Sequence, residues 1–550
     1  MIRTAGRIAA WARAGGVVIA AIGLLGIASA AIGVEPDPGA ASRGDLRRLL
    51  ASPDGLRIAG SALDARVLGR FYRARDFAPV WGTGAGGRAR AALLLEALAG
   101  AEGHGLDPAR YHLQAIRARP SGGSPRDATE VELLLTDALL RYATEIRAGR
   151  RIPGYTEPDW AIVTPRFDPV ATLTQALREP ASFATVLASL PPPASDYRAL
   201  VAGLGRYRAL AAQGGWSAVP SGTFLKPGDE EGRVTALRAR LAAEDELVSR
   251  RADVRYDDPL AEAVRRFQAR HGLAVDGIVG PATVQALNVP VTDRVQQIVV
   301  NLERWRWLPR ELGRHHIVVN APDARLHIVA DGRPVLTSRV VVGDLRHPTP
   351  VVQAWVDAVV LHPRWNVPTS IAVEDILPRL RENRRYLAEN DIVVLERRES
   401  DPFGLAIDWA AIPAERFPFR LQQQPGPGNP LGRIKLDIPN RFDVYLHDTP
   451  TRALFARPVR TASHGCIRVE RADDLAVHVL EDEGQGWTRQ RLADALDAGE
   501  TQRIPLTRPL PVYILYWTAF VEPDGSVQFR EDVYGRDRRL AAALAGGGAR

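Results

Sequence analysis

The 550-residue sequence contains one cysteine, Cys466, and this scarcity excludes an intramolecular disulfide as a support of the fold. Beyond the first 33 residues it also lacks any uncharged apolar run long enough to cross a bilayer. A dense basic stripe is missing too, although the formal net charge is +7 and the pI is about 9.7, because the basic residues are spread along the whole chain. The composition therefore argues against nucleic acid as a partner and favours an anionic polymer or a membrane surface.

The first 33 residues have the composition of an export segment. Arg3, Arg7 and Arg13 precede an uncharged stretch from residue 14 to residue 33, with no acidic residue among them. We predict that residues 1–33 form either a signal peptide, cleaved near the small residues 28–30, or an uncleaved membrane anchor. Either outcome places the rest of the chain in the periplasm, tethered to the inner membrane in the second case. In such an oxidising compartment, a lone thiol is expected to be kept for its reactivity.

The single cysteine lies in a segment suited to nucleophilic chemistry. A thiol attacks as thiolate, so it needs a nearby base or positive charge and an exposed, turn-like setting. His464 and Arg468 flank Cys466, Gly465 allows close approach of the backbone, and His447 precedes the cysteine by 19 residues. We predict that Cys466 is a nucleophile. The alternative is that it is a small buried apolar residue, which is the commoner fate of a free cysteine.

The run Ser463-His464-Gly465-Cys466, the arginine after it and the upstream histidine resemble the signature of the YkuD-like L,D-transpeptidases. The resemblance extends in outline to the large, YcbB-like branch of that family. It implies catalytic roles for Cys466, His447, His464 and Gly465, with the N–H groups of Gly465 and Cys466 stabilising an oxyanion. It also implies substrate-binding roles for Ser463, Arg468, Tyr445 and Asp448, and it implies neither a metal nor an organic cofactor.

Several of these roles have open alternatives. His464 could simply pack within its loop. Arg468 could bind a substrate carboxylate or form a plain salt bridge. In the family, the backbone carbonyl after the histidine typically orients the imidazole, so a side-chain role for Asp448 stays open.

The sequence divides into regions of different pattern, and the predicted fold class is multidomain α+β. Residues 44–222 read as a helical scaffold domain, in which the aromatic runs 71–81 and 104–111 resemble the scaffold domain of the large branch. Their aromatic side chains are expected to be core. Residues 225–290 predict a small three-helix module that resembles a peptidoglycan-binding domain, and it could bind the cell wall or serve as a spacer.

Residues 310–500 predict a β-rich catalytic domain, completed by strands in 505–535. The strand pattern alone favours an antiparallel sandwich or barrel, whereas the resemblance implies a mixed sheet with a few helices. A helical and loop-rich stretch at about 371–430 resembles the capping insertion of the large branch. Such a cap could close on substrate and exclude water.

The resemblance implies an L,D-transpeptidase that forms 3→3 crosslinks through a cysteine thioester, with peptidoglycan stem peptides and glycan strands as its partners. Carbapenems are expected to acylate Cys466. Three alternatives stay open: a carboxypeptidase or crosslink hydrolase, a transpeptidase that anchors a lipoprotein, and a non-catalytic wall-binding scaffold. We expect a monomer, and other wall synthases are possible partners.

Overall fold

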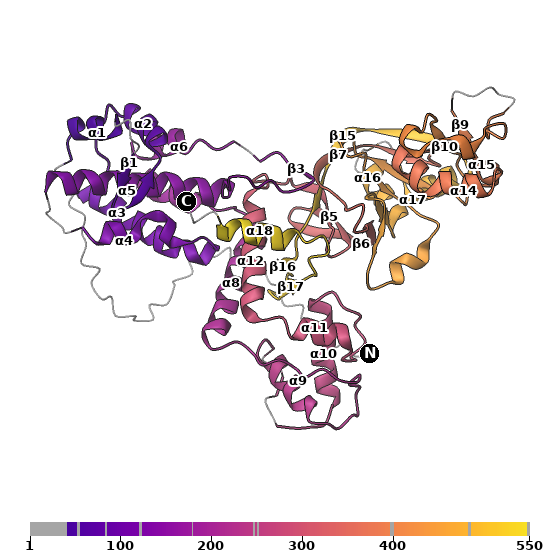
Figure 1. Ribbon diagram of the computed structural model, residues 1–550, viewed down its shortest axis with the longest axis horizontal. Coiled ribbons are helices and arrows are strands. Elements are labelled where there is room, and N and C mark those ends of the chain that lie inside the picture. The colour runs from indigo at the N-terminus through magenta and orange to yellow at the C-terminus, as the bar shows by residue number, and fades with distance from the viewer. Residues whose placement is uncertain are drawn as a thin grey trace, which may run out of the picture.

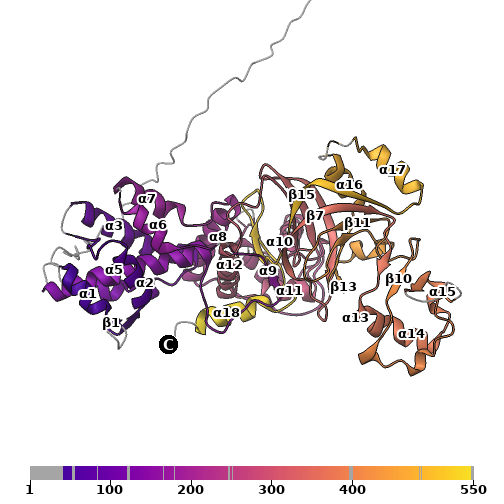
Figure 2. The same cartoon turned by 90° about the horizontal axis from the view of Figure 1, so that it is seen from above.

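The computed structural model describes residues 41–51, 56–82, 85–119, 124–164, 166–178, 180–245, 248–249, 252–395, 401–481, 484 and 486–546. The predicted signal or anchor at 1–33 lies outside these residues. Within them, no helix combines the length and the apolar character needed to cross a membrane. The molecule is elongated, with the N-terminal helices at one end and the stretch around α14 (Leu377–Glu382) and α15 (Tyr386–Glu389) at the other (Figures 1 and 2).

The N-terminal region is a helical bundle around one buried core. α5 (Pro125–Ala148) runs through it and begins with a capping box between Ser124 and Asp127, which satisfies the free N–H groups of its first turn. Around it lie α1 (Arg43–Leu50), α2 (Ala65–Arg73), α3 (Ala85–Ala99), α4 (Leu113–Arg117), α6 (Pro169–Ala176) and α7 (Pro180–Ser189), with the hairpin β1 (Leu56–Ile58) and β2 (Ser61–Leu63). Phe71, Tyr72 and Trp81 of the first aromatic run are fully buried, as the core interpretation expected.

Packing departs from the predicted range of the scaffold domain at two points. α8 (Ser195–Ala212) lies against α12 (Val291–Arg306), and its buried side chains join the core of the β-rich domain rather than that of the N-terminal bundle. The short strand β3 (Trp160–Ala161) pairs with the large sheet as well. Both segments are amphipathic or apolar, and the sequence alone does not tell which core they join.

The predicted three-helix module is confirmed. It consists of α9 (Arg233–Ala242), α10 (Asp258–Arg270) and α11 (Pro281–Leu287) around a separate small core. Buried Gln268 stabilises the turn between α10 and α11, because its amide contacts the side chain of Asp276 and the backbone of Gly277 and Ile278. The turn is therefore held by a side chain whose polar atoms are satisfied inside the module.

The β-rich domain is built on a mixed sheet that closes on itself. Its strands run in the order β11 (Ile434–Asp437), β12 (Leu446–His447), β14 (Ile467–Val469), β6 (Arg333–Gly343), β5 (Arg325–Ala330), β4 (His315–Asn320), β15 (Gln502–Leu515) and β7 (Val351–Leu361). The sheet closes because β11 pairs with β7 as well as with β12. The antiparallel expectation was wrong, since β12 and β14 run parallel, as do β4 and β15, so the mixed sheet implied by the resemblance is the one observed.

The predicted insertion forms a subdomain with its own apolar core. Its sheet joins β8 (Trp365–Asn366), β10 (Leu421–Gln423) and β9 (Ile392–Val394). Its helical part comprises α13 (Thr369–Ile371), the π-helical turn η4 (Ala372–Ile376), α14 (Leu377–Glu382), α15 (Tyr386–Glu389) and the short turns η5 (Trp409–Ala411) and η6 (Ala414–Arg416). We call this part, residues 365–423, the insertion subdomain. α16 (Ala472–Glu481) and α17 (Arg489–Asp497) follow the cysteine motif.

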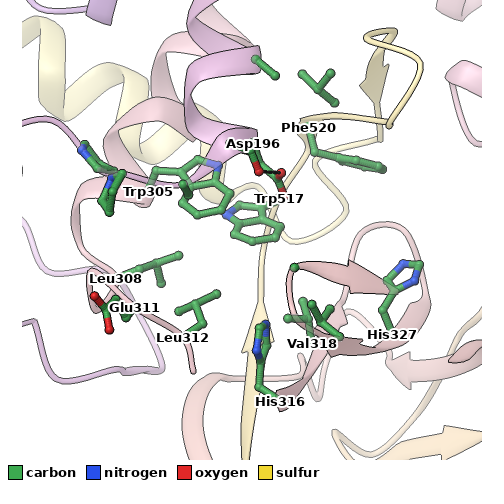
Figure 3. A pocket seen from close by; sticks show the side chains of 18 of the residues that line it. Asp196, Trp305, Leu308, Glu311, Leu312, His316, Val318, His327, Trp517 and Phe520 are labelled. Carbon is green, nitrogen blue, oxygen red and sulfur yellow. Dashed lines mark hydrogen bonds between the residues drawn. The ribbon is translucent and has the colours of Figure 1, made fainter. Parts of the chain in front are cut away.

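A cavity of about 910 Å³ lies where α12, β4, β5 and the segment after β15 meet (Figure 3). Trp305 and Trp517 stack in its wall with ring centroids 4.5 Å apart, and His316 and His327 reach it from the sheet. None of the residues predicted to act on substrate lines this cavity. This cavity is therefore separate from the cysteine.

Candidate active site

The cysteine loop joins two short strands on the same neighbour. β13 (Thr461–Ser463) pairs parallel with β6, and β14, directly after Cys466, pairs antiparallel with it. Gly465 turns the chain between them with φ of +103°, a conformation that disfavours any side chain. The hydroxyl of Thr349 donates to the Gly465 carbonyl (2.8 Å), which ties the loop to the turn after β6.

The buried hydroxyl of Ser463 stabilises this loop through two hydrogen bonds. It donates to the Cys466 carbonyl (2.6 Å) and accepts the N–H of Gly465 (3.2 Å). Of the two backbone N–H groups predicted to stabilise an oxyanion, that of Gly465 is therefore already bonded, while that of Cys466 has no hydrogen-bond partner among the described residues. Ser463 therefore stabilises the cysteine loop, and its predicted contact with substrate stays a prediction.

His447 lies on β12, the parallel neighbour of β14, directly beside Arg468. Its Nδ1 is 2.5 Å from the carbonyl oxygen of Asp448. A carbonyl can only accept, so Nδ1 carries the proton and Nε2 keeps its lone pair. Burial, and then the charge of Arg468, lower the pKa of His447 from 6.5 to about 3. The imidazole is thus a neutral base with a fixed tautomer.

The carboxylate of Asp448 points elsewhere. It accepts the N–H of Arg433 (3.0 Å) and lies 3.3 Å from the guanidinium of Arg452. The residue therefore reaches the imidazole through its backbone, while its side chain fixes the loop in front of β11.

The thiol of Cys466 is partly exposed and lies against Tyr445. Both the N–H and the phenol of Tyr445 hydrogen-bond to the sulfur, and the thiol points toward the carbonyl oxygen of Asp443 at 3.9 Å. Tyr445 and His447 are two residues apart on one strand, so they share a face, and their rings meet edge to face at 5.6 Å. Burial raises the pKa of the Cys466 thiol above 9.0, against the opposing effects of Tyr445, Lys435 and Arg468. The resting pair is a neutral thiol and a neutral imidazole.

The side chain of Arg468 is half-buried and has no ion pair or hydrogen bond to any described residue, and its Nε is buried without a partner. Burial lowers its pKa, and the neighbouring Cys466 opposes this shift. A partly desolvated guanidinium without a partner is costly, so this position is suited to an anionic ligand. Of the two predicted alternatives, the structure shows no salt bridge for this arginine among the described residues.

His464 faces the insertion subdomain. Its Nε2 is 3.3 Å from a carboxylate oxygen of Asp375 on η4, and its ring lies 4.6 Å from that of His347. The Nε2 of His347 is 3.3 Å from Glu374 on the same turn. The indole of Trp365 also donates a hydrogen bond to the Tyr445 phenol. The insertion subdomain therefore contacts the cysteine loop through His464, the turn after β6 through His347, and the residue before β12 through Tyr445.

The structure brings the predicted residues Cys466, His447, Arg468 and Tyr445 together at one end of the closed sheet. Sequence reasoning missed Trp365, Lys435, His347 and Thr349, each of which comes from another strand or turn. Only Lys435 carried a signal in the sequence, because it is one of two lysines in the chain. The others lack a local pattern, since tertiary contacts alone bring them to the site.

These features define a class: a multidomain α+β protein whose β-rich domain holds a cysteine, a neutral histidine and an unpaired arginine at one rim. Comparison with known families agrees. Residues 314–501 match the "L,D-transpeptidase catalytic domain" of the YkuD family, residues 66–204 match a "Scaffold domain", and residues 230–287 match a "Putative peptidoglycan binding domain". Three regions of the chain thus match models of an L,D-transpeptidase catalytic domain, a scaffold domain and a peptidoglycan-binding domain, and the α+β fold class with its helical and β-rich parts is confirmed.

Similar proteins are known over parts of the chain. A "Putative L,D-transpeptidase" of Haemophilus influenzae is 36% identical over 248 residues, which is 45% of this chain and 49% of the relative. The N-acetylmuramoyl-L-alanine amidase CwlL of Bacillus licheniformis is 44% identical over 72 residues, 13% of this chain and 20% of the amidase. The chain thus spans about half the length of the first relative and a fifth of the second.

Among solved structures, an L,D-transpeptidase fragment from Xylanimonas cellulosilytica has 17% identity and a TM-score of 0.17 over 54% of this chain and 99% of its own. The L,D-transpeptidase of Stackebrandtia nassauensis has 11% identity and a TM-score of 0.21 over 54% and 97%. At these TM-scores the likeness carries no weight for fold or function.

Proposed function

We propose that this protein is an L,D-transpeptidase that forms 3→3 peptidoglycan crosslinks through a thioester on Cys466. One observation carries the proposal: β12 and β14 run side by side, so that a neutral imidazole and an unpaired guanidinium flank the cysteine loop. A base, a nucleophile and an anion-binding group are the parts that acyl transfer from a carboxylate-bearing peptide needs.

In the first half-reaction, His447 Nε2 takes the thiol proton while the sulfur attacks a carbonyl carbon. The bond attacked is the amide between the L-centre of the third stem residue and the terminal D-Ala. Arg468 binds the carboxylate of that D-Ala, and the Cys466 N–H donates to the developing oxyanion. The C–N bond then breaks, and the imidazolium gives its proton to the departing D-Ala amine.

In the second half-reaction, the side-chain amine of a diamino acid in another stem attacks the thioester carbon. His447 removes a proton from that amine, the C–S bond breaks, and the proton returns to the Cys466 sulfur. The overall exchange releases one D-Ala for each crosslink. The three contacts of the insertion subdomain with His464, His347 and Tyr445 support closure over the thioester, which gives the amine an advantage over water.

The cellular setting belongs to the same proposal. Export to the periplasm follows from the composition of residues 1–33. The module at 230–287 would hold the enzyme on glycan strands, and carbapenems would acylate Cys466.

The test is mass spectrometry of the purified protein and its Cys466→Ala variant after incubation with a disaccharide that carries a tetrapeptide stem. We expect loss of D-Ala and a 3→3 dimer with the wild type only. Tripeptide product without a dimer would assign a hydrolase. No product with either protein, together with retention on intact sacculi, would instead favour a wall-binding scaffold.

A further inference from the structure

Lys435 is unusual in the composition of this chain. Of 71 lysines and arginines, only Lys226 and Lys435 are lysines. Lys226 is exposed in the peptidoglycan-binding-like module, whereas Lys435 lies on β11 beside the cysteine site. Wherever else this chain carries a basic side chain, it uses arginine. A lysine differs in being a compact ammonium on a flexible stem, without the planar guanidinium.

The structure fixes this ammonium between two groups. Lys435 is the register partner of His447 across β11 and β12. Its Nζ lies 2.7 Å from a carboxylate oxygen of Asp437 and 4.4 Å from the centroid of the Tyr445 ring. The side chain is 23% exposed, so the cation–π contact is partly desolvated, which strengthens it relative to a fully exposed pair.

The ring under Lys435 is the one that touches the nucleophile. The Tyr445 phenol hydrogen-bonds to the Cys466 sulfur and accepts a hydrogen bond from Trp365. The same ring lies edge to face against His447 at 5.6 Å. A group that fixes this ring therefore fixes the distance between the phenol and the sulfur.

We propose that Lys435 is a positioning residue of the Cys466 site, whose ammonium, held by Asp437 against the Tyr445 ring, keeps the phenol on the sulfur and stabilises the thiolate as it forms. This role deepens the proposed function and rests on it. No transfer of a proton from Lys435 is required, because the phenol and the Tyr445 N–H supply the hydrogen bonds to the sulfur.

The charges around the site agree with this role. The ammonium of Lys435 lowers the pKa of the Cys466 thiol, after the larger effects of burial and of Tyr445, and Arg468 acts in the same direction. Two negative charges lie near these cations. Asp443 raises the pKa of Tyr445, and Asp437 pairs with Lys435 and also lies 3.5 Å from the guanidinium of Arg503. Loss of Lys435 would leave Arg468 as the one cation assisting the thiolate among the groups that shift its pKa.

The presence of a single cysteine makes the test direct. Iodoacetamide alkylation of the folded full chain is followed by intact mass from about pH 6 to about pH 10, since the rate reports the thiolate fraction. The proteins are the wild type, Lys435→Met, Lys435→Arg, Tyr445→Phe and the double variant Lys435→Met/Tyr445→Phe, with Lys226→Met as the matched control. Circular dichroism verifies that each variant is folded.

We expect Lys435→Met to slow alkylation at neutral pH by about three- to tenfold and to shift the profile to higher pH, since one pKa unit is a tenfold change in thiolate. Tyr445→Phe should do the same, and the double variant should show less than the sum of the two effects. Lys435→Arg should restore part of the rate, while Lys226→Met should match the wild type. An unshifted profile in folded Lys435→Met, or fully additive effects with Tyr445→Phe, would overturn the role.

Failure of this inference and failure of the proposed function give different results, because alkylation requires no peptidoglycan. A shifted alkylation profile with no crosslinking by the wild type would remove the transpeptidase and keep the positioning role. If crosslinking is normal but the profile of Lys435→Met is unshifted, the transpeptidase stands and the positioning role falls.

Discussion

The Nδ1 of His447 lies 2.5 Å from the backbone carbonyl oxygen of Asp448, and this contact leaves Nε2 as the basic nitrogen. The orienting group is a peptide carbonyl, so the side chain that follows the histidine is free for a different task. In Asp448 that task is to accept the N–H of Arg433 and the guanidinium of Arg452.

Asp448→Asn should therefore retain acylation of Cys466 within a few-fold of the wild type. The amide keeps one acceptor for the Arg433 N–H, and the main chain still orients the imidazole. His447→Gln should lower the same rate by about 10²- to 10⁴-fold, because the general base is lost. Both are measured as the rate of carbapenem adduct formation on Cys466 by intact mass. A loss in Asp448→Asn as deep as that in His447→Gln would assign the orienting role to the carboxylate.

The pKa of His447 also predicts how stability depends on pH. Its folded value of about 3 lies below the ordinary value of 6.5, so between these values the unfolded chain binds a proton that the folded chain rejects. The free energy of unfolding should therefore fall as the pH drops through 6.5 toward 3, by at most about 1.4 kcal/mol per pH unit from this group.

His447→Gln removes this titration, so the variant should lose less stability than the wild type between neutral pH and about pH 4. Urea unfolding at several pH values, followed by tryptophan fluorescence, measures the difference. His104→Gln is the matched variant, because it also removes a histidine of lowered pKa but lies in the N-terminal region, away from the cysteine. Burial and then Arg306 lower the pKa of His104 to about 4. Equal slopes for the wild type and His447→Gln would contradict the buried neutral imidazole.

The sequence was informative where the signal is local. The strands at residues 315–343 and the helices after Glu470 follow from periodicity, and the motif around Cys466 carries its own residue types. Ring closure of the sheet and the parallel pairing of β12 with β14 are long-range contacts between short strands. No periodicity encodes which of these strands become neighbours.

The same limit explains the side chains that were missed. Trp365 and His347 reach the site from β8 and from the turn after β6, more than a hundred residues before the cysteine. The resemblance implied a substrate-binding role for Ser463, and this role stays a prediction. The sequence did not indicate that its hydroxyl bonds two backbone groups of the loop around Gly465, whose φ is positive.

Gly465→Ala tests that loop conformation. A methyl group there would meet its nearest neighbours at 3.8–3.9 Å, which is ordinary contact, so the cost comes from φ of +103° and not from a clash. We expect a loss of about 1–2 kcal/mol in stability. A larger relative loss is expected in acylation of Cys466, because the loop sets the direction of the thiol and of its N–H. Unchanged acylation, with thermal unfolding also unchanged, would show that the loop tolerates a side chain.

The insertion subdomain should decide between amine and water as acceptor. The Asp375 carboxylate faces His464 and the Glu374 carboxylate faces His347, each at 3.3 Å. These groups are partly exposed, so each contact is worth about 0.2–1 kcal/mol after screening. The double variant Glu374→Gln/Asp375→Asn should raise the ratio of tripeptide to 3→3 dimer about two- to tenfold. A control pair of exposed carboxylates in the same subdomain, Asp408→Asn/Glu415→Gln, should leave the ratio unchanged. An unchanged ratio in the first variant would mean that closure does not depend on these contacts.

Arg468 gives the sharpest prediction about substrate, because it has no ion-pair partner in the described chain and its Nε is buried without a hydrogen bond. Arg468→Met should lower kcat/KM for a tetrapeptide donor by about 10- to 100-fold, since a charged hydrogen bond contributes about 1.5–3 kcal/mol. Arg468→Lys should recover little, because it lacks the bidentate geometry. With a donor whose terminal carboxylate is replaced by an amide, the loss in Arg468→Met should be much smaller, because only the smaller effect of Arg468 on the thiolate remains. Unfolding should change little in Arg468→Met, because no internal partner is left unpaired. If the variant is equally impaired with the amide donor, then Arg468 acts on the thiolate and does not bind the carboxylate.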